Sequence, residues 1–346
     1  MKVGLLSRWN AACGVSLHAE MIGRELLRRG HRLTVYAPTL ESANRWWHHL
    51  ILREDEPFVV RCYREHTPDG TEGYLNEQPV LADPPELFIV ESYEKLPHGA
   101  VERLVRKLKD RGSFCVAVVH EGAYEELRYR SLDLFDAVVV FDERYAREVV
   151  RNRVKEEKLR LVPYPCYPVR EGKRAFAEDG PVRFFSFGRQ PPEEYLPYLR
   201  VLERFDEPFT YKVVRPRELL PVTYPWLVQE RKSLVYETAL KELHASDVHL
   251  LPKGQSRRVV LSSTLHQVLG SLTPTVVPDT RYFETLPKGD DSPVLFYRNE
   301  KELLTSLKRL VKDEELRERL KENARRFVTE RELSKVANQF ERLFEV

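Results

Sequence analysis

The sequence contains few cysteines, few methionines and no long apolar run. Its 346 residues include 4 cysteines and 2 methionines. The cysteines stand far apart and form no C-x-x-C pair: Cys13, Cys62, Cys115 and Cys166. Their spacing argues against a zinc site and predicts free thiols in a reducing compartment. No apolar segment approaches the length of a membrane span, and no signal peptide precedes the first apolar segment, so we expect a cytoplasmic protein.

An excess of charge of one sign is also absent. The 56 basic and 54 acidic residues leave a net charge of +2, which gives no global attraction to nucleic acid or to an anionic membrane. No aromatic residues interleave with the basic ones in a stacking pattern, so we expect no nucleic-acid partner. The many charged side chains and the scarcity of methionine are compatible with a thermophilic source.

The chain opens with a strand–helix–strand pattern. Residues 2–7 are short and apolar, as in a buried strand, and residues 17–29 carry apolar side chains at helical spacing. Gly30 stands where a helix C-cap needs a residue that tolerates positive φ, and residues 33–37 form a second apolar run. Such a βαβ unit predicts a parallel sheet, with ligands bound beyond the carboxyl ends of its strands.

The loop between this first strand and helix, residues 11–16, lacks two glycine-rich motifs. It contains neither Gly-x-Gly-x-x-Gly nor Gly-x-x-x-x-Gly-Lys-Ser/Thr. Its one glycine, Gly14, has two interpretations. It forms a tight turn that packs the helix on the sheet, or it opens an anion site at the helix N-terminus.

The alternation of strands and helices continues in two halves, and we predict an α/β protein with two parallel-sheet domains. Residues 169–181 are polar and charged, and we place the domain boundary there. The predicted parts are an N-terminal domain (1–168), a linker (169–181), a C-terminal domain (182–330), and a C-terminal helix (331–346) that packs back toward the N-terminal domain. Two such domains that face each other leave a cleft, the usual place for a ligand.

Several local elements are also expected. Buried strands are predicted over 114–119 and 182–187, helices over 193–205 and 259–270, and an irregular excursion over 64–85.

Polar residues follow the expected strands in both halves. His120 and Glu121 come directly after the apolar run 114–119. A histidine there contacts a hydroxyl or a phosphate, titrates near neutrality, or only holds its loop in place. Six cations lie in loops of the second half: Arg189, Arg215, Arg217, Lys253, Arg257 and Arg258. Cations at one edge of a sheet suit a phosphate or diphosphate, and the alternative is a basic surface exposed to solvent.

An aromatic group lies after the second strand. Trp46, Trp47 and His48 either stack on a sugar or pack a loop against the domain. With the apolar residues 50–52, they also allow a peripheral membrane contact.

The order and spacing of several motifs resemble those of the group 1 glycosyltransferases, a family with the GT-B fold that includes glycogen synthase-like and mannosyltransferase enzymes. The resemblance runs nearly from end to end. The motifs that carry it are Gly14-Val15 before a helix, His120-Glu121 after a central strand, Phe187-Gly188-Arg189, residues 244–252 as the family's Ala-Asp-x-x-x-x-Pro strand, and Pro274-Thr-Val-Val277.

The resemblance implies two Rossmann-like domains, of which 1–168 is the acceptor-side domain and 182–330 the nucleotide-sugar domain. It implies a nucleotide sugar in the cleft, held mainly by the second domain, and transfer with retention at the anomeric carbon, without a metal or other cofactor. Arg189 would stabilise the diphosphate leaving group, and His120 would face the donor sugar. The other residues implied in donor binding are Gly14, Val15, Glu121, Gly188, Arg215, Arg217, Lys253, Gly254, Gln255, Ser256 and Thr264. The acceptor is a sugar, a small molecule or a lipid-linked group, with Trp46, Trp47 and His48 as its candidate contacts.

Three donor-site features of the family are altered in this chain. Glu194 stands where the family has a lysine on the diphosphate, and a carboxylate there would repel that group. Residues 252–270 contain no acidic residue in place of the family's Glu-x7-Glu, although Ser256 and Thr264 have roughly that spacing. The family's Gly-x-Gly-Pro is replaced by residues 214–217. Three alternatives follow: an active transferase with a rearranged basic set, a catalytically inactive binding or scaffolding relative, and an unrelated two-domain enzyme such as an epimerase.

Overall fold

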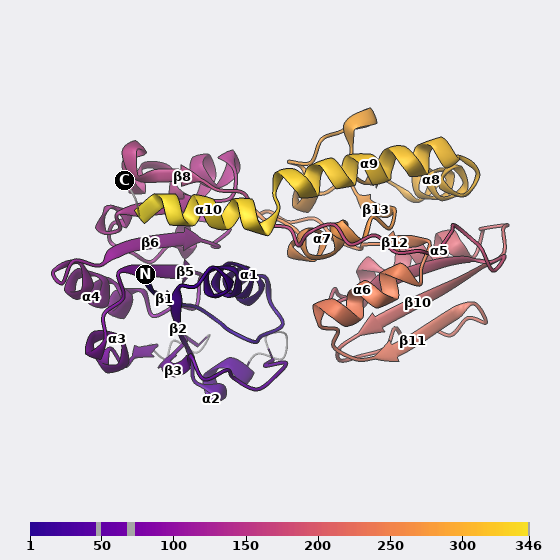
Figure 1. Cartoon of the computed structure of the whole chain (residues 1–346). Coiled ribbons are helices and arrows are strands. Elements are labelled where there is room, and N and C mark those ends of the chain that lie inside the picture. Colours follow the sequence, from indigo (N-terminus) through magenta and orange to yellow (C-terminus); the bar gives the residue numbers. More distant parts are fainter. Residues whose placement is uncertain (46–49, 68–72, 345–346) are drawn as a thin grey trace. The chain divides into compact units, whose positions relative to one another are not determined.

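The computed structural model describes residues 1–45, 50–67 and 73–344. The chain divides into two compact units. Unit 1 consists of Met1–Pro165 with Leu333–Val346, and unit 2 consists of Cys166–Glu332. The segment 169–181 lies within unit 2, where Arg174 Nε pairs with Asp247 Oδ1 at 3.1 Å. The last helix of the chain lies in unit 1 (Figure 1).

Unit 1 is built on a mainly parallel sheet. Among its described residues the strand order is β4-β3-β2-β1-β5-β6-β7-β8, and the pairing of β3 with β4 is the antiparallel one. Its strands are β1 (Lys2–Leu6), β2 (Arg32–Pro38), β3 (Val59–Arg64), β4 (Tyr74–Leu75), β5 (Leu87–Ser92), β6 (Phe114–Val119), β7 (Ala137–Val140) and β8 (Leu159–Leu161). Its α-helices are α1 (Gly14–Arg28), α2 (Leu40–Asn44), α3 (Gln78–Ala82), α4 (His98–Lys109) and α10 (Leu333–Phe344).

The central strands of unit 1 are mainly apolar because a parallel sheet is covered on both faces. All six residues of β5 are buried, and Leu5 of β1 lies opposite Val35 and Ile89 on the two neighbouring strands. Helix α1 begins three residues before the predicted periodic segment, because Cys13 caps it and accepts a hydrogen bond from the Ser16 N–H.

Helix α10 packs on α1 within unit 1. Glu341 accepts from Arg29 Nη1 and from His31 Nε2, each at 2.6 Å, and Phe340 is buried beneath the helix. Gly30, between Arg29 and His31, has φ +88°, so the predicted C-cap of α1 is confirmed.

Unit 2 is built on a sheet whose described strand pairs are all parallel, in the order β11-β10-β9-β12-β13-β14. Its strands are β9 (Val182–Phe187), β10 (Phe209–Arg215), β11 (Leu227–Arg231), β12 (Val248–Leu250), β13 (Thr275–Pro278) and β14 (Leu295–Tyr297). Its α-helices are α5 (Leu196–Leu202), α6 (Tyr236–His244), α7 (Ser263–Val268), α8 (Glu300–Lys312) and α9 (Glu314–Glu330).

Helices cover both faces of this second sheet. Phe184 of β9 belongs to a core with residues of α5, α8 and α9, whereas the next residue, Phe185, belongs to a core with residues of α6 and α7. Successive residues of a strand point to opposite faces, so the mainly apolar strand 182–187 contributes side chains to two cores.

Some local predictions were wrong. The segment 64–85 contains β4 and α3. The helix expected over 193–205 is divided into a 3-10 turn, Pro192–Glu194, and α5. The helix expected over 259–270 has its α-helical part only from Ser263, because the side chain of Ser262 accepts from the Leu265 N–H and caps it. In the described ranges, no helix combines the length and the apolar character needed to cross a membrane.

Candidate functional site

Both units bring polar side chains to the place where the strand order reverses. In unit 1 the chain proceeds from β1 to one side of the sheet and from β5 to the other, and β9 and β12 have the same relation in unit 2. Loops that leave two adjacent parallel strands in opposite directions make room for a ligand at the carboxyl edge. Each unit therefore has one edge where a ligand has room to bind.

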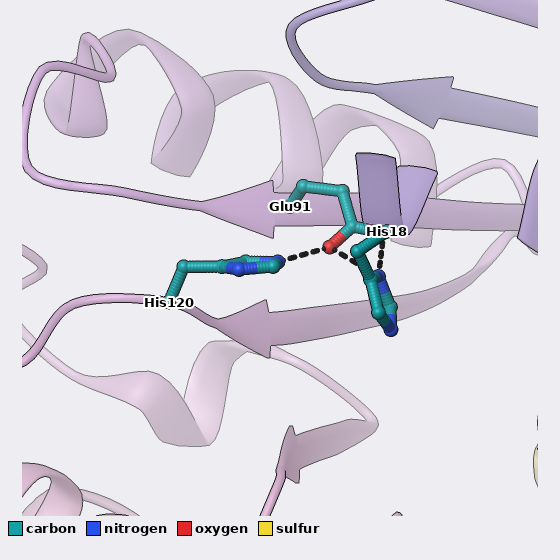
Figure 2. A group of neighbouring side chains, drawn as sticks. All are labelled: His18, Glu91 and His120. Carbon is teal, nitrogen blue, oxygen red and sulfur yellow. Dashed lines mark hydrogen bonds and ion pairs between the residues drawn. The ribbon is translucent and has the colours of Figure 1, made fainter. Parts of the chain in front are cut away.

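Three polar side chains of unit 1 meet at this edge: His18, Glu91 and His120 (Figure 2). Glu91 lies near the carboxyl end of β5, His120 directly follows β6, and His18 lies on α1. Nε2 of His120 is 2.6 Å from Oε2 of Glu91, and Nδ1 of His18 is 2.9 and 3.0 Å from the two Glu91 oxygens. Their side chains are almost fully buried, with His120 the most exposed at 8%.

The protonation of this group follows from burial and from the contacts. Burial alone would raise the pKa of Glu91, but the charges and ring nitrogens of His18 and His120 lower it to about 2. Burial lowers the pKa of His120 below its ordinary value, although Glu91 acts in the opposite direction. At neutral pH Glu91 is therefore ionised.

The same three residues are candidate metal ligands. One ligand atom of each lies within 4.8 Å of the others. Two imidazoles and a carboxylate are a ligand set that zinc accepts. Both histidines already contact Glu91, so a metal would have to replace these hydrogen bonds.

Glu121 takes part in a second buried contact. Its Oε1 accepts from Ser92 Oγ at 2.6 Å and from His98 Nε2 at 3.1 Å, and its side chain is 0% exposed. Ser92 ends β5 and His98 begins α4. Glu121 therefore fastens the loop after β6 to two neighbouring elements.

Gly14 and Val15 form the first turn of α1 and are half-buried. The Gly14 carbonyl accepts from the Tyr164 hydroxyl at 2.9 Å. One N–H of this helix end, that of Ser16, is already bound by the Cys13 thiol at 3.4 Å.

His18 and Glu91 were not among the site residues predicted from sequence. The position of Glu91 could have been predicted, because it directly follows the apolar run 87–90, as His120 follows the run 114–119. His18 had a weaker signal, since a single polar residue within an apolar helix face is a common feature of helices.

In unit 2, Arg189 and Lys253 come together from two adjacent strands. Arg189 follows β9 and Lys253 follows β12, and these strands are paired in the sheet. Burial, with the charge of Arg189, lowers the pKa of Lys253 to about 8, while the carboxylate of Glu194 acts in the opposite direction. Nζ of Lys253 lies 5.1 Å from the centre of the Tyr282 ring.

Two glycines lie at this edge of unit 2. Gly188 allows an unusual backbone conformation, and Gly254 allows a side chain to approach the backbone closely. Gly188 has φ +127°, a conformation that L side chains rarely adopt. A Cβ on Gly254 would lie 2.6 Å from Oε1 of Glu194. The carboxylate expected to repel a diphosphate therefore lies against the Gly254 backbone, beside Lys253.

The other predicted cations are placed differently. Arg215 is buried, and its guanidinium donates to the carbonyls of Glu218 at 2.5 Å and Gln190 at 2.9 Å. It fastens the loop after β9 to the loop after β10. Three predicted cations are exposed: Arg217, Arg257 and Arg258.

The remaining donor-site candidates make local contacts. Gln255 Nε2 is 3.5 Å from the Asp279 carbonyl, and Ser256 Oγ accepts from the Arg258 N–H at 3.1 Å. Thr264 lies in the first turn of α7 and is half-buried. Trp46, Trp47 and His48 lie outside the described residues.

Comparison with known proteins places the fold. No protein-family model matches this chain. Anabaena HepE in complex with UDP-glucose superposes with a TM-score of 0.70 over 100% of both chains, at 11% identity. Trehalose-6-phosphate synthase OtsA gives a TM-score of 0.67 at 11% identity, over 100% of this chain and 99% of that chain. An α-glucosyltransferase in complex with UDP gives 0.64 at 12% identity, over 99% and 98%. At these identities the likeness establishes the fold, which is the GT-B fold of glycosyltransferases.

Proposed function

We propose that the protein is a glycosyltransferase that moves a sugar from a nucleotide-sugar donor to an acceptor, with retention at the anomeric carbon and without a metal or other cofactor. The observation that carries this proposal is the meeting of Arg189 and Lys253 at the strand ends of unit 2. They are 64 positions apart in sequence, and only the sheet brings their charges together.

Two neighbouring cations bind a diphosphate better than either binds it alone. In the free protein they repel each other, which is one reason for the lowered pKa of Lys253. A diphosphate relieves this repulsion and accepts hydrogen bonds from both side chains. As the sugar leaves, negative charge develops on the diphosphate, and Arg189 and Lys253 stabilise that charge.

The structural neighbours support uridine nucleotides as the first probes. HepE was solved with UDP-glucose and the α-glucosyltransferase with UDP. The acceptor is a sugar, a small molecule or a lipid-linked group.

A second candidate is a non-catalytic member of the same fold that binds a nucleotide without transferring its sugar. Two observations favour it: the carboxylate of Glu194 lies against Gly254, and the segment 252–270 contains no acidic residue. A site of this kind would bind UDP and UDP-glucose equally and release no sugar.

The test is calorimetric binding of UDP, GDP and ADP, followed by UDP-glucose, with mass spectrometry of the sugar released or transferred. We expect selective binding of one nucleotide and its loss in Arg189→Ala. The matched control is Arg200→Ala, an exposed arginine of the same unit that pairs with Glu300 at 2.6 Å. Binding without sugar release across an acceptor panel would identify the non-catalytic protein, and no binding of any nucleotide at millimolar concentration would contradict both candidates.

A further inference from the structure

Two charged side chains at the carboxyl edge of unit 2 have no bonded partner among the described residues. Glu194 ends the 3-10 turn Pro192–Glu194 after β9, and Lys253 follows β12, the strand paired with β9. Oε2 of Glu194 is buried, and within the described ranges no hydrogen bond or ion pair joins either side chain to another residue. An unpaired buried carboxylate oxygen is costly, so this edge is suited to a ligand that pairs with it.

The backbone around Glu194 is fixed on both sides. Pro191 and Pro192 restrict φ at the start of the turn, and the Glu194 N–H donates to the Pro191 carbonyl at 3.1 Å. The next residue, Tyr195, is 0% exposed, and its hydroxyl donates to Gln190 Oε1 at 3.1 Å. The direction in which the Glu194 side chain leaves the backbone is therefore determined by the turn.

Gly254 leaves room for the Glu194 carboxylate. A Cβ at position 254 would lie 2.6 Å from Oε1 of Glu194, so any other residue there would displace the carboxylate. Gly254 directly follows Lys253 in the chain. Burial and the charge of Arg189 lower the pKa of Lys253, and the charge of Glu194 opposes them. The carboxylate therefore lies near both cations without forming an ion pair with Lys253.

A ligand that satisfies this edge needs an anionic group and a hydrogen-bond donor next to each other. Arg189 and Lys253 suit phosphate oxygens, which accept charge-assisted hydrogen bonds. A carboxylate only accepts hydrogen bonds, so Glu194 suits a hydroxyl and repels a phosphate. A sugar linked to a phosphate offers both groups, because its ring hydroxyls lie close to the glycosyl phosphate bond. A bare diphosphate offers the anionic group alone.

We propose that Glu194 is a specificity-determining residue that accepts a hydrogen bond from a hydroxyl of the sugar attached to the phosphate held by Arg189 and Lys253. This assignment rests on the proposed function, because it takes a nucleotide sugar as the ligand. A carboxylate beside two cations lowers the affinity for a bare diphosphate and raises the affinity for a diphosphate that carries a sugar. The site should therefore discriminate between UDP-glucose and UDP.

The test is calorimetric binding of UDP and UDP-glucose to the full-length protein at pH 6.5, below the pKa of Lys253. The wild type should bind UDP-glucose more tightly than UDP. In Glu194→Gln the ratio of the two affinities should fall about tenfold, the value of one hydrogen bond, whereas UDP should bind at least as tightly because a repelling charge is gone. The matched control is Glu193→Gln, which removes the exposed neighbouring carboxylate and should change neither affinity.

Gly254→Ala is a second variant that acts on the same carboxylate from another residue. It keeps the Glu194 charge but displaces the carboxylate, so it should also lower the ratio of the two affinities, and it decides the question if Glu194→Gln fails to fold. An unchanged ratio in these variants would overturn the proposal. Equal weakening of UDP and UDP-glucose would also overturn it, because Glu194 would then contact the nucleotide.

Glucose 1-phosphate and inorganic phosphate separate this assignment from the proposed function. If neither uridine nucleotide binds, tighter binding of glucose 1-phosphate than of phosphate, lost in Glu194→Gln, would support the sugar contact while counting against the proposed function. Nucleotide binding with an unchanged ratio in Glu194→Gln would leave the proposed function standing and overturn the role of Glu194. No binding of any of the four probes at millimolar concentration would contradict both.

Discussion

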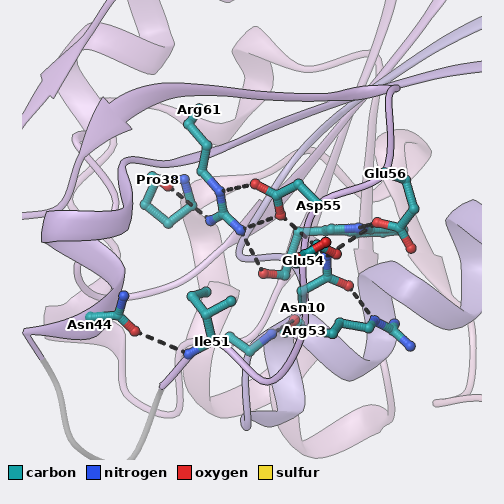
Figure 3. Close-up of polar contacts among 12 residues, drawn as sticks. Asn10, Pro38, Asn44, Ile51, Arg53, Glu54, Asp55, Glu56 and Arg61 are labelled. Atoms are coloured by element: carbon teal, nitrogen blue, oxygen red, sulfur yellow. Dashed lines mark hydrogen bonds and ion pairs between the residues drawn. The ribbon is translucent and has the colours of Figure 1, made fainter.

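The Nε–H of Arg53 donates to Oδ1 of Asn10 at 2.6 Å and joins the loop after β1 to a segment 43 positions later (Figure 3). Asn10 has φ +55°, which asparagine tolerates better than most residues. Its Nδ2 lies 3.2 Å from the Glu54 carbonyl and 3.1 Å from Glu56 Oε2. One side chain thus holds together the loop that leads into α1.

Asn10→Ala should therefore destabilise the protein by about 2–4 kcal/mol, since it removes several hydrogen bonds and puts alanine in a left-handed conformation. Asn10→Gly should cost less than Asn10→Ala, because glycine accepts the positive φ. Urea unfolding measures the cost, and hydrogen exchange of residues 50–58 localises it. Asn44→Ala, which removes one exposed contact to the Ile51 N–H, is the control. Equal effects of the alanine variants at 10 and 44 would contradict this role.

His249 should make the protein sensitive to acid. It is fully buried, its ring stacks on Phe187 with centroids 5.8 Å apart, and burial lowers its pKa from 6.5 to about 3. Between pH 6.5 and 3 the unfolded chain therefore binds a proton at this histidine that the folded chain does not bind, and stability falls as the pH falls. His249→Phe should remove up to about 4 kcal/mol of this loss.

The measurement is urea unfolding of wild type and His249→Phe from pH 8 to pH 4. The difference at pH 8, where both side chains are neutral, gives the packing effect and serves as the reference. Below pH 6.5 the difference in unfolding free energy between the two proteins should shift steadily in favour of His249→Phe. A difference in unfolding free energy that stays constant across this range would show that His249 is not the acid-sensitive group.

Lys253 should titrate near pH 8, well below an ordinary lysine. Removal of the Arg189 charge in Arg189→Ala should raise this pKa, and removal of the Glu194 charge in Glu194→Gln should lower it further. The measurement is the ¹³C chemical shift of dimethylated lysines against pH, with the Lys253 signal assigned by Lys253→Met. The opposite direction in either variant would show that Arg189 and Glu194 do not act on Lys253.

Phe340 should control the stability of the contact between α10 and α1. It is 1% exposed, and its ring centroid lies 6.0 Å from that of His18. Phe340→Ala should cost about 3–5 kcal/mol, the usual loss for a buried phenylalanine, and should increase hydrogen exchange in both helices. Phe344→Ala, at a half-buried position of the same helix, should cost less. Unchanged exchange in α1 of the Phe340 variant would contradict the predicted coupling.

The sequence by itself determined the fold class and the positions of the main strands. The apolar runs 114–119 and 182–187 coincide with β6 and β9, and Gly30 ends α1 as predicted. These features depend on periodicity and backbone preference, which act over a few residues. Their order also placed His120 and Arg189 just beyond strand ends.

Only the tertiary structure decided what these residues contact. His18, Glu91 and His120 come from three elements up to 102 positions apart, and no local pattern links them. Arg215 and Lys253 looked alike in sequence, yet the first is bonded to two backbone carbonyls and the second lies beside Arg189. The direction of a side chain and its protonation depend on the neighbours that the whole sheet assembles, and a local segment does not contain that information.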